Sequence, residues 1–255
     1  MMMIHKDRMS ENIKTTMGIL GLALTLMVFI FAPTSWGEER KPSEFESNMN
    51  KLRKDLESGV SLPGEQPFVL RSFRPFAGDD WIGNAVAYGC YRKGQAPGQK
   101  GPGDAELLED LEIISKHWQL IRLYGADNDT RRILQVIDDH SLPIKVIQGI
   151  WLSPEEDNPS EKAANINSVL LGVELANQYP DIVIAVSVGN ETQVFWSGHR
   201  MNPETLIRYV RAVRSQVTVP VTTADDYLYW NKPESREVAA ETDFVFTHIH
   251  PLWNG

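Results

Sequence analysis

Short apolar, β-branched runs alternate with longer amphipathic stretches between residues 84 and 251, and this alternation limits the folds that the chain can adopt. The runs predict strands at 84–91, 119–125, 143–152, 181–191, 219–225 and 243–251. The stretches between them predict helices at 103–118, 129–140, 160–179, 203–216 and 233–241. Because strands joined through helices run in the same direction by right-handed crossovers, the pattern predicts an α/β protein with a parallel sheet.

A parallel sheet of this kind is either open and doubly wound or closed into a (β/α)8 TIM barrel. The chain lacks the Gly-x-Gly-x-x-Gly and Gly-x-x-x-x-Gly-Lys-Ser/Thr motifs of nucleotide-binding doubly wound folds. Polar and aromatic residues fall at or just past the C-terminal ends of successive strands: Tyr88, Arg122, Tyr124, Trp151, Asn190, Glu191, Asp225, His248 and His250. In a barrel these ends converge on one mouth. The sequence therefore predicts an incomplete (β/α)8 barrel of about six βα units.

The composition bears on the ligand more than on the fold. The 255 residues carry a formal net charge of −9, which argues against a nucleic-acid partner and favours a neutral or cationic ligand. Seven Trp and seven Tyr offer faces on which sugar rings stack, although any single aromatic residue is more often part of a core. Cys90 is the single cysteine, so no disulfide forms within the chain.

Residues 1–37 are typical of a signal peptide or a signal anchor. Basic residues precede an uncharged apolar run, residues 17–33, whose length is at the lower limit for spanning a bilayer. Small residues at 35–37 fit cleavage by a signal peptidase, whereas the long basic region fits an uncleaved anchor. We expect export, with the chain either anchored on the outer face of the cytoplasmic membrane or secreted or periplasmic after cleavage.

Residues 38–67 differ in composition from the segments on either side. They are charged and polar and close with Pro-Gly punctuation, which predicts a polar tether that is partly helical. Residues 68–255 then form the incomplete barrel.

Glu191 is the strongest candidate for chemistry. It closes the fourth predicted strand beside Asn190, where a carboxyl group can donate a proton to a leaving oxygen. The alternative is that Glu191 caps the following helix or pairs with Arg200. Asn190 is a candidate partner for a sugar hydroxyl, and its alternative is an ordinary turn residue.

Charged residues on other strands are candidates for the same mouth. Arg122 interrupts an apolar strand, so it either orients an acidic catalytic group or forms a structural ion pair. His248 and His250 share one strand face, and because no further ligand stands at zinc spacing we expect hydrogen bonds to substrate rather than a metal. Asp225 either reaches sugar hydroxyls or starts a loop.

Aromatic residues complete the set of candidates. Trp230 and Trp253 are predicted stacking platforms, with core packing as the alternative. Tyr88 and Tyr124, at the ends of the first two strands, are predicted to contact substrate. No cofactor is implied.

Four motifs in a fixed order carry a resemblance to a known family. They are "IRLYG" on the second strand, "VSVGNET" on the fourth, "VTTAD" on the fifth and "HIHPLW" after the sixth. Together they resemble glycoside hydrolase family 17, the β-1,3-glucanases and related glucan transglycosylases of the large retaining barrel clan. The resemblance implies that Glu191 is the general acid/base, that Asn190 contacts the sugar 2-hydroxyl, and that Arg122 and Tyr124 are the family's strand-two pair.

The chain departs from that family at two points. His250 stands where the family usually has Tyr, and the family's nucleophile, a Glu ending a seventh strand, has no counterpart before Gly255. We therefore expect an incomplete copy of an enzyme that cleaves β-1,3-linked glucan with retention. Alternatives are a glucan transglycosylase, a non-catalytic glucan-binding module and, as the weakest, a metal-dependent hydrolase that uses the two histidines.

Overall fold

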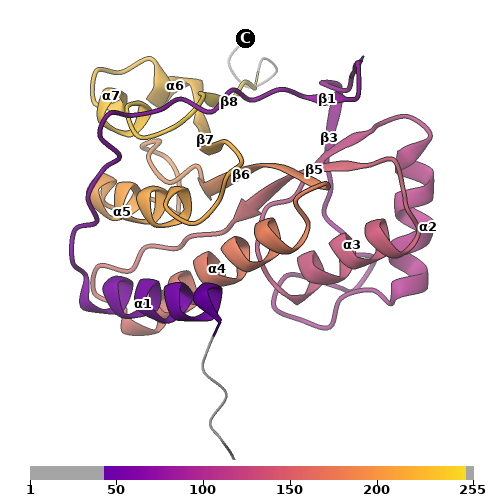
Figure 1. Ribbon diagram of the computed structural model, residues 1–255, viewed down its shortest axis with the longest axis horizontal. Helices are drawn as coiled ribbons and strands as arrows, with labels where there is room; N and C mark the ends of the chain where they lie inside the picture. The colour runs from indigo at the N-terminus through magenta and orange to yellow at the C-terminus, as the bar shows by residue number, and fades with distance from the viewer. Residues whose placement is uncertain (1–42, 251–255) are drawn as a thin grey trace, which may run out of the picture. The chain divides into compact units, whose positions relative to one another are not determined.

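A computed structural model describes residues 43–250 and contains one six-stranded parallel sheet (Figure 1). Its strands are β3 (Ala85–Ala87), β4 (Leu120–Arg122), β5 (Lys145–Ile150), β6 (Val183–Asn190), β7 (Val221–Asp226) and β8 (Phe246–His248). Each strand pairs with the one before it, in the order β3-β4-β5-β6-β7-β8. A doubly wound sheet reverses its strand order at a switch point, whereas this order runs on without reversal, as in a barrel. The predicted α/β class and incomplete (β/α)8 barrel are confirmed.

Each of the five predicted helix ranges contains a helix. They are α2 (Asp104–Ser115), α3 (Asn128–Asp139), α4 (Pro159–Gln178), α5 (Pro203–Arg214) and the short α7 (Ser235–Ala239). A further short helix, α6 (Tyr227–Trp230), precedes the last predicted range and was not predicted. The helices pack their apolar faces on one face of the sheet, where residues such as Leu134, Val173, Val186 and Val213 form the main core. The outermost strands, β3 and β8, are three residues each and shorter than predicted.

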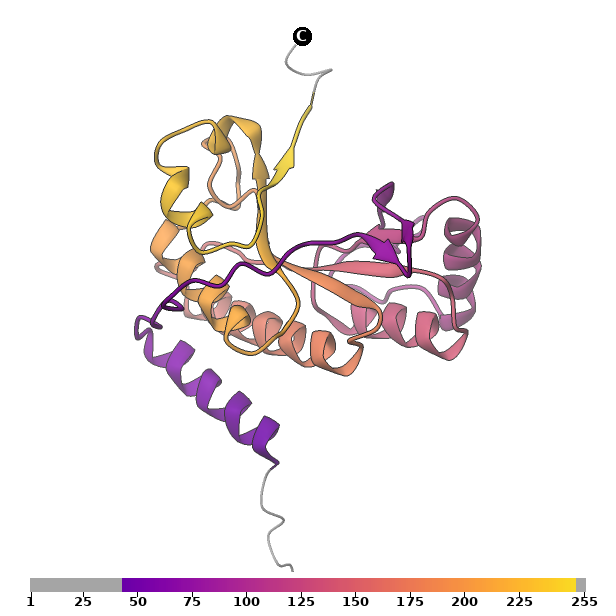
Figure 2. The same ribbon diagram turned by 45° about the horizontal axis from the view of Figure 1, so that its top comes forward.

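The other face of the sheet curls inward (Figure 2). Leu120, Ile147 and Ala185 project from it and form a separate apolar cluster with Ile82. Phe244 joins the cluster and stacks on Phe73 with ring centroids 4.6 Å apart. The chain before the sheet, which includes the ribbon of β1 (Phe76–Ala77) and β2 (Asp80–Trp81), therefore helps to cover the inner face.

Helix α1 (Glu44–Ser58) lies within the segment predicted to be a tether. Ser43 caps it by accepting a hydrogen bond from the Glu46 N–H, and the Glu46 carboxylate accepts one from the Ser43 N–H. Leu52 and Leu56 are buried in the main core, and α1 packs beside α4 (Figure 1). This helix is therefore part of the globular unit rather than of a tether, and the unit begins before the predicted residue 68, because Leu52 and Leu56 bury their side chains in its core.

The apolar run at 17–33 lies outside the described residues, as does Trp253. Within residues 43–250, no helix combines the length and the apolar character that a membrane span requires. The expected signal or anchor stays a prediction.

The packing of α1 predicts a loss of stability when its buried face is truncated. Leu56 is fully buried, so Leu56→Ala should lower the free energy of unfolding by about 2–5 kcal/mol. Val60, just past the helix, is 52% exposed, and Val60→Ala is the control that should change it by less than about 0.5 kcal/mol. Urea unfolding followed by circular dichroism measures both. Equal stability of the two variants would contradict the packing of α1 on the domain.

Candidate active site

Four polar side chains from three strands meet inside the curled sheet. His248 Nδ1 lies 2.7 Å from Glu191 Oε1, and His248 Nε2 lies 2.6 Å from Arg122 Nη1. Arg122 also donates from Nη2 to Asn190 Oδ1 at 2.7 Å. The sequence places these residues at the ends of β4, β6 and β8, and the structure joins them into one hydrogen-bonded chain, here called the Arg-His-Glu chain (Arg122, His248 and Glu191).

The proton positions in this chain follow from the chemistry of arginine. A guanidinium group only donates, so His248 Nε2 must accept and Nδ1–H must donate to the Glu191 carboxylate. His248 is then neutral in the folded protein. Burial lowers the pKa of His248 below its usual 6.5, and the charge of Arg122 lowers it further, against the raising effect of Glu191.

Arg122 is buried and enclosed by aromatic rings. Its side chain is 8% exposed, and its guanidinium carbon lies 4.6 Å from the ring centre of Tyr124 and 4.7 Å from that of Phe246. Burial lowers the pKa of Arg122, and Glu191 and Tyr124 oppose this effect. Cation–π contacts and two hydrogen bonds to side chains thus compensate the cost of holding the charge away from water.

Glu191 stands on a turn with an unusual backbone. Its φ is +52°, a left-handed value that is uncommon for a residue with a side chain, and Gly189, two residues before it, has φ +80°. The pairing of β6 with β7 shifts register at this point, and the Glu191 N–H donates to the Ala224 carbonyl at 2.8 Å. The irregular strand end aims the Glu191 carboxylate at His248.

Asp225 anchors the turn that carries Glu191. Its carboxylate accepts hydrogen bonds from the backbone N–H groups of Gln193 at 2.8 Å and Val194 at 3.1 Å, and it is completely buried. Burial raises the pKa of Asp225 from 3.8 to about 6, against the lowering effect of these hydrogen bonds. Of the two roles considered for Asp225, the structure supports the loop anchor, because the side chain contacts backbone rather than open space.

His250 lies at the edge of the cluster. Its Nε2 is 3.8 Å from Glu191 Oε1 and 3.9 Å from Asp226 Oδ2, and its side chain is 43% exposed. Asp226 directly follows Asp225 in the sequence, and Phe246 was not singled out from the sequence. The signal for Phe246 was its position two residues before His248, which puts both on the same strand face.

Glu191, His248 and His250 bring three ligand-type atoms within 4.8 Å of one another. A metal at this point would need the Nδ1 lone pair of His248, and the ring proton would then move to Nε2, which faces the guanidinium group of Arg122. The ion would also add positive charge beside a buried cation. The geometry therefore fits a hydrogen-bonded network better than the metal-dependent alternative.

Two predicted site residues lie outside the Arg-His-Glu chain. Tyr88 donates its hydroxyl to Asp110 Oδ2 on α2 at 3.0 Å, and burial raises its pKa. Trp230 donates from Nε1 to the Phe246 carbonyl at 3.1 Å and packs on the main core, so its core role is the one the structure supports. Tyr124 is 40% exposed and lies over Arg122 at the mouth.

The chain matches the model of a known protein family. The model of the BtgE/BtgC glycoside hydrolase domain matches residues 85–255. The chain belongs to this family. The matched residues include all six strands of this chain's parallel sheet, β3 to β8, and the whole Arg-His-Glu chain. The glycoside hydrolase class expected from the sequence is confirmed. No curated protein matched the chain.

Solved structures give the same fold. An endo-laminarinase from Formosa Hel1_33_131 is similar with a TM-score of 0.58 and 24% identity, over 67% of this chain and 50% of that one. A glycoside hydrolase family 17 β-1,3-glucanosyltransferase from Rhizomucor miehei has a TM-score of 0.52 and 23% identity, over 67% and 58%. This chain thus spans half, or slightly more than half, of the length of these two proteins. At such identities the likeness shows a common fold, and the resemblance to family 17 is confirmed at that level.

The hydrogen bonds of the Arg-His-Glu chain predict the tautomer of His248. At pH 7, ¹⁵N-correlated NMR of the imidazole nitrogens should show His248 neutral, with the proton on Nδ1 and Nε2 unprotonated. Its titration midpoint should lie below 6.5, because burial and Arg122 disfavour the charged ring. His248→Gln identifies the signal. A neutral ring protonated on Nε2 would contradict the arrangement.

The raised pKa of Asp225 predicts a pH dependence of stability. Between pH 3.8 and about 6 the folded state holds a proton that the unfolded state has released. The contribution of Asp225 is therefore greatest at low pH and declines as pH rises through about 6. The free energy of unfolding of the natural protein minus that of Asp225→Asn should fall between pH 4 and pH 7. Asp139→Asn, on the exposed end of α3, controls for general charge effects, and a constant difference for Asp225→Asn would contradict the prediction.

Proposed function

We propose that the domain cleaves β-1,3-linked glucan with net retention and that Glu191 is its general acid/base. The observation that carries the proposal is the position of Glu191: a partly exposed carboxylate on a left-handed turn, bonded to a neutral histidine that is bonded in turn to a buried arginine. Such strain is retained where surrounding structure enforces it, and it is common at catalytic residues.

The substrate class in this proposal rests on the neighbours. One is named an endo-laminarinase and another a β-1,3-glucanosyltransferase, and the family is one of glycoside hydrolases. The negative net charge of −9 is compatible with a neutral polysaccharide. Asn190 stands beside Glu191 and would contact a sugar hydroxyl through its amide nitrogen, because its oxygen is occupied by Arg122.

In the proposed reaction Glu191, in its protonated form, gives its proton to the glycosidic oxygen while a second carboxylate forms a bond to the anomeric carbon and the glycosidic bond breaks. The Arg-His-Glu chain holds the carboxylate in place, because His248 donates to one of its oxygens and leaves the other for the substrate. After the leaving group departs, the same carboxylate accepts a proton from the attacking water or sugar hydroxyl. Attack by a sugar hydroxyl gives transglycosylation, the alternative that the name of the second neighbour supports.

Retention needs a second carboxylate about 5 to 5.5 Å from the first. Within residues 43–250, Glu155 is bonded to Arg208 and Tyr209, and Glu241 is paired with Arg211, so neither is free to serve. We therefore propose that the nucleophile is the Glu of a seventh strand, as the resemblance to family 17 implies. A non-catalytic glucan-binding module, the other alternative, does not call for the strained carboxylate.

The location of the protein is also a proposal. The apolar run at 17–33, preceded by basic residues, supports export across the cytoplasmic membrane, with either an outer-face anchor or release after cleavage. Export would bring the domain to glucan outside the cytoplasm.

Substitution of Glu191 tests the catalytic proposal. In the full-length protein, Glu191→Gln should lower kcat on laminari-oligosaccharides by about 10²–10⁴-fold, because the amide cannot transfer the proton. Glu112→Gln, an exposed glutamate on α2, is the matched control and should retain activity. Chromatography of the products separates hydrolysis from transfer to longer chains. Full turnover by Glu191→Gln would overturn the assignment.

A further inference from the structure

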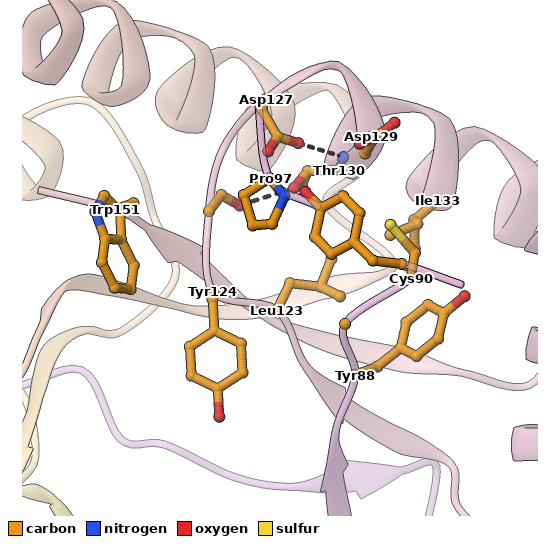
Figure 3. A pocket seen from close by; sticks show the side chains of 13 residues that line it. Tyr88, Cys90, Pro97, Leu123, Tyr124, Asp127, Asp129, Thr130, Ile133 and Trp151 are labelled. Atoms are coloured by element: carbon orange, nitrogen blue, oxygen red, sulfur yellow. Dashed lines mark hydrogen bonds between the residues drawn. The ribbon is translucent and has the colours of Figure 1, made fainter. Parts of the chain in front are cut away.

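A separate cavity opens beside the Arg-His-Glu chain, at the C-terminal ends of β3, β4 and β5 (Figure 3). Its volume is about 580 Å³, within the range of small-molecule sites. Tyr124 belongs to both places, since it lines the cavity and lies over Arg122 at 4.6 Å. The cavity is therefore next to the candidate active site, separated from it by one aromatic ring.

Aromatic side chains held by other contacts form the walls. Trp151 and Tyr124 stand at one end and Tyr88 at the other (Figure 3). The ring of Trp151 meets His199 edge-on at 4.5 Å, and the hydroxyl of Tyr88 is bonded to Asp110. These rings are fixed before any ligand arrives, so little conformational entropy is lost when a flat apolar face stacks on them.

The charged groups that line the cavity are acidic. Asp127 and Asp129 line it at the start of α3, and Asp127 accepts from the Thr130 N–H at 2.8 Å with one of its two oxygens. Burial raises the pKa of Asp129, and the charge of Asp127 raises it further. No lysine or arginine lines the cavity among the described residues, and Arg132, 3.7 Å from Asp129, is shared with Asp104 at 2.6 Å.

We propose that this cavity is a subsite for an uncharged sugar unit and that Asp127 and Asp129 make it reject units that carry a carboxylate, sulfate or phosphate. Aromatic walls suit the faces of a pyranose ring, and carboxylate oxygens accept hydrogen bonds from its hydroxyls. An anionic substituent would instead meet two like charges, and Arg132, the cation beside Asp129, lies closer to Asp104 than to Asp129. The inference rests on the proposed function, because the glucan at Glu191 would reach the cavity past Tyr124.

Calorimetry with two tetrasaccharides tests the selectivity. The first ligand is laminaritetraose, and the second is laminaritetraose whose primary hydroxyls have been oxidised to carboxylates. The full-length protein with Glu191→Gln keeps both ligands intact during the titration. We expect the neutral ligand to bind at least about tenfold more tightly in low salt, and the ratio to shrink in 0.5 M salt as the charges are screened.

The double variant Asp127→Asn, Asp129→Asn should bring the ratio of the two affinities to within about threefold, mainly by strengthening binding of the oxidised ligand. Asn also caps helices, so the start of α3 is kept, and thermal unfolding checks that the variant is folded. Asp139→Asn, an exposed aspartate at the other end of α3, should leave the ratio unchanged. Trp151→Ala should weaken binding of the neutral ligand about tenfold by removing a wall.

The outcomes separate this inference from the proposed function. Equal affinity for the two ligands, or a ratio that the double variant does not change, would overturn the selectivity even if Glu191→Gln abolishes turnover. Absence of binding by either ligand, together with absence of turnover in the natural protein, would overturn both proposals.

Discussion

The contact between Arg122 and His248 is the constraint on which the rest of the site depends. These residues lie on β4 and β8, the second and sixth strands of the sheet, yet their side chains meet at 2.6 Å. A flat sheet would separate strands four positions apart by roughly 19 Å. The contact therefore requires the sheet to curl on itself. The curl in turn supplies the buried guanidinium group with the hydrogen-bond partners without which its burial would be costly.

The inner face beneath this contact is apolar. Leu120, two residues before Arg122, lies in the inner cluster, and Phe246, two residues before His248, packs against it. Because side chains alternate along a strand, β4 and β8 each carry an apolar residue low in the barrel and a polar one at the mouth. These apolar residues exclude water from the inner side of the site, and hydrogen bonds in the Arg-His-Glu chain are stronger because the local dielectric constant is low. Asp225 completes the site by fixing the turn that carries Glu191.

Much of this arrangement could be predicted from the sequence. Strand and helix positions follow from local periodicity, and parallel strands necessarily bring their C-terminal ends to one edge. That rule alone grouped Glu191, Asn190, Arg122, His248 and His250, all of which lie together in the structure. The direction of a single side chain was less predictable. Tyr88 and Trp230 stand at the correct edge but find partners on α2 and β8.

The sequence by itself therefore determined the class of fold, the edge of the sheet that carries the chemistry and the residues gathered there, because those depend on periods of 2 and 3.6 residues. Only the tertiary structure decided which of these residues bond to one another. Asp225 turns toward the backbone of the next loop, and His248 takes its tautomer from Arg122, which is 126 positions earlier in the chain. Such partners are set by sheet curvature and strand register, and these depend on contacts far apart in sequence.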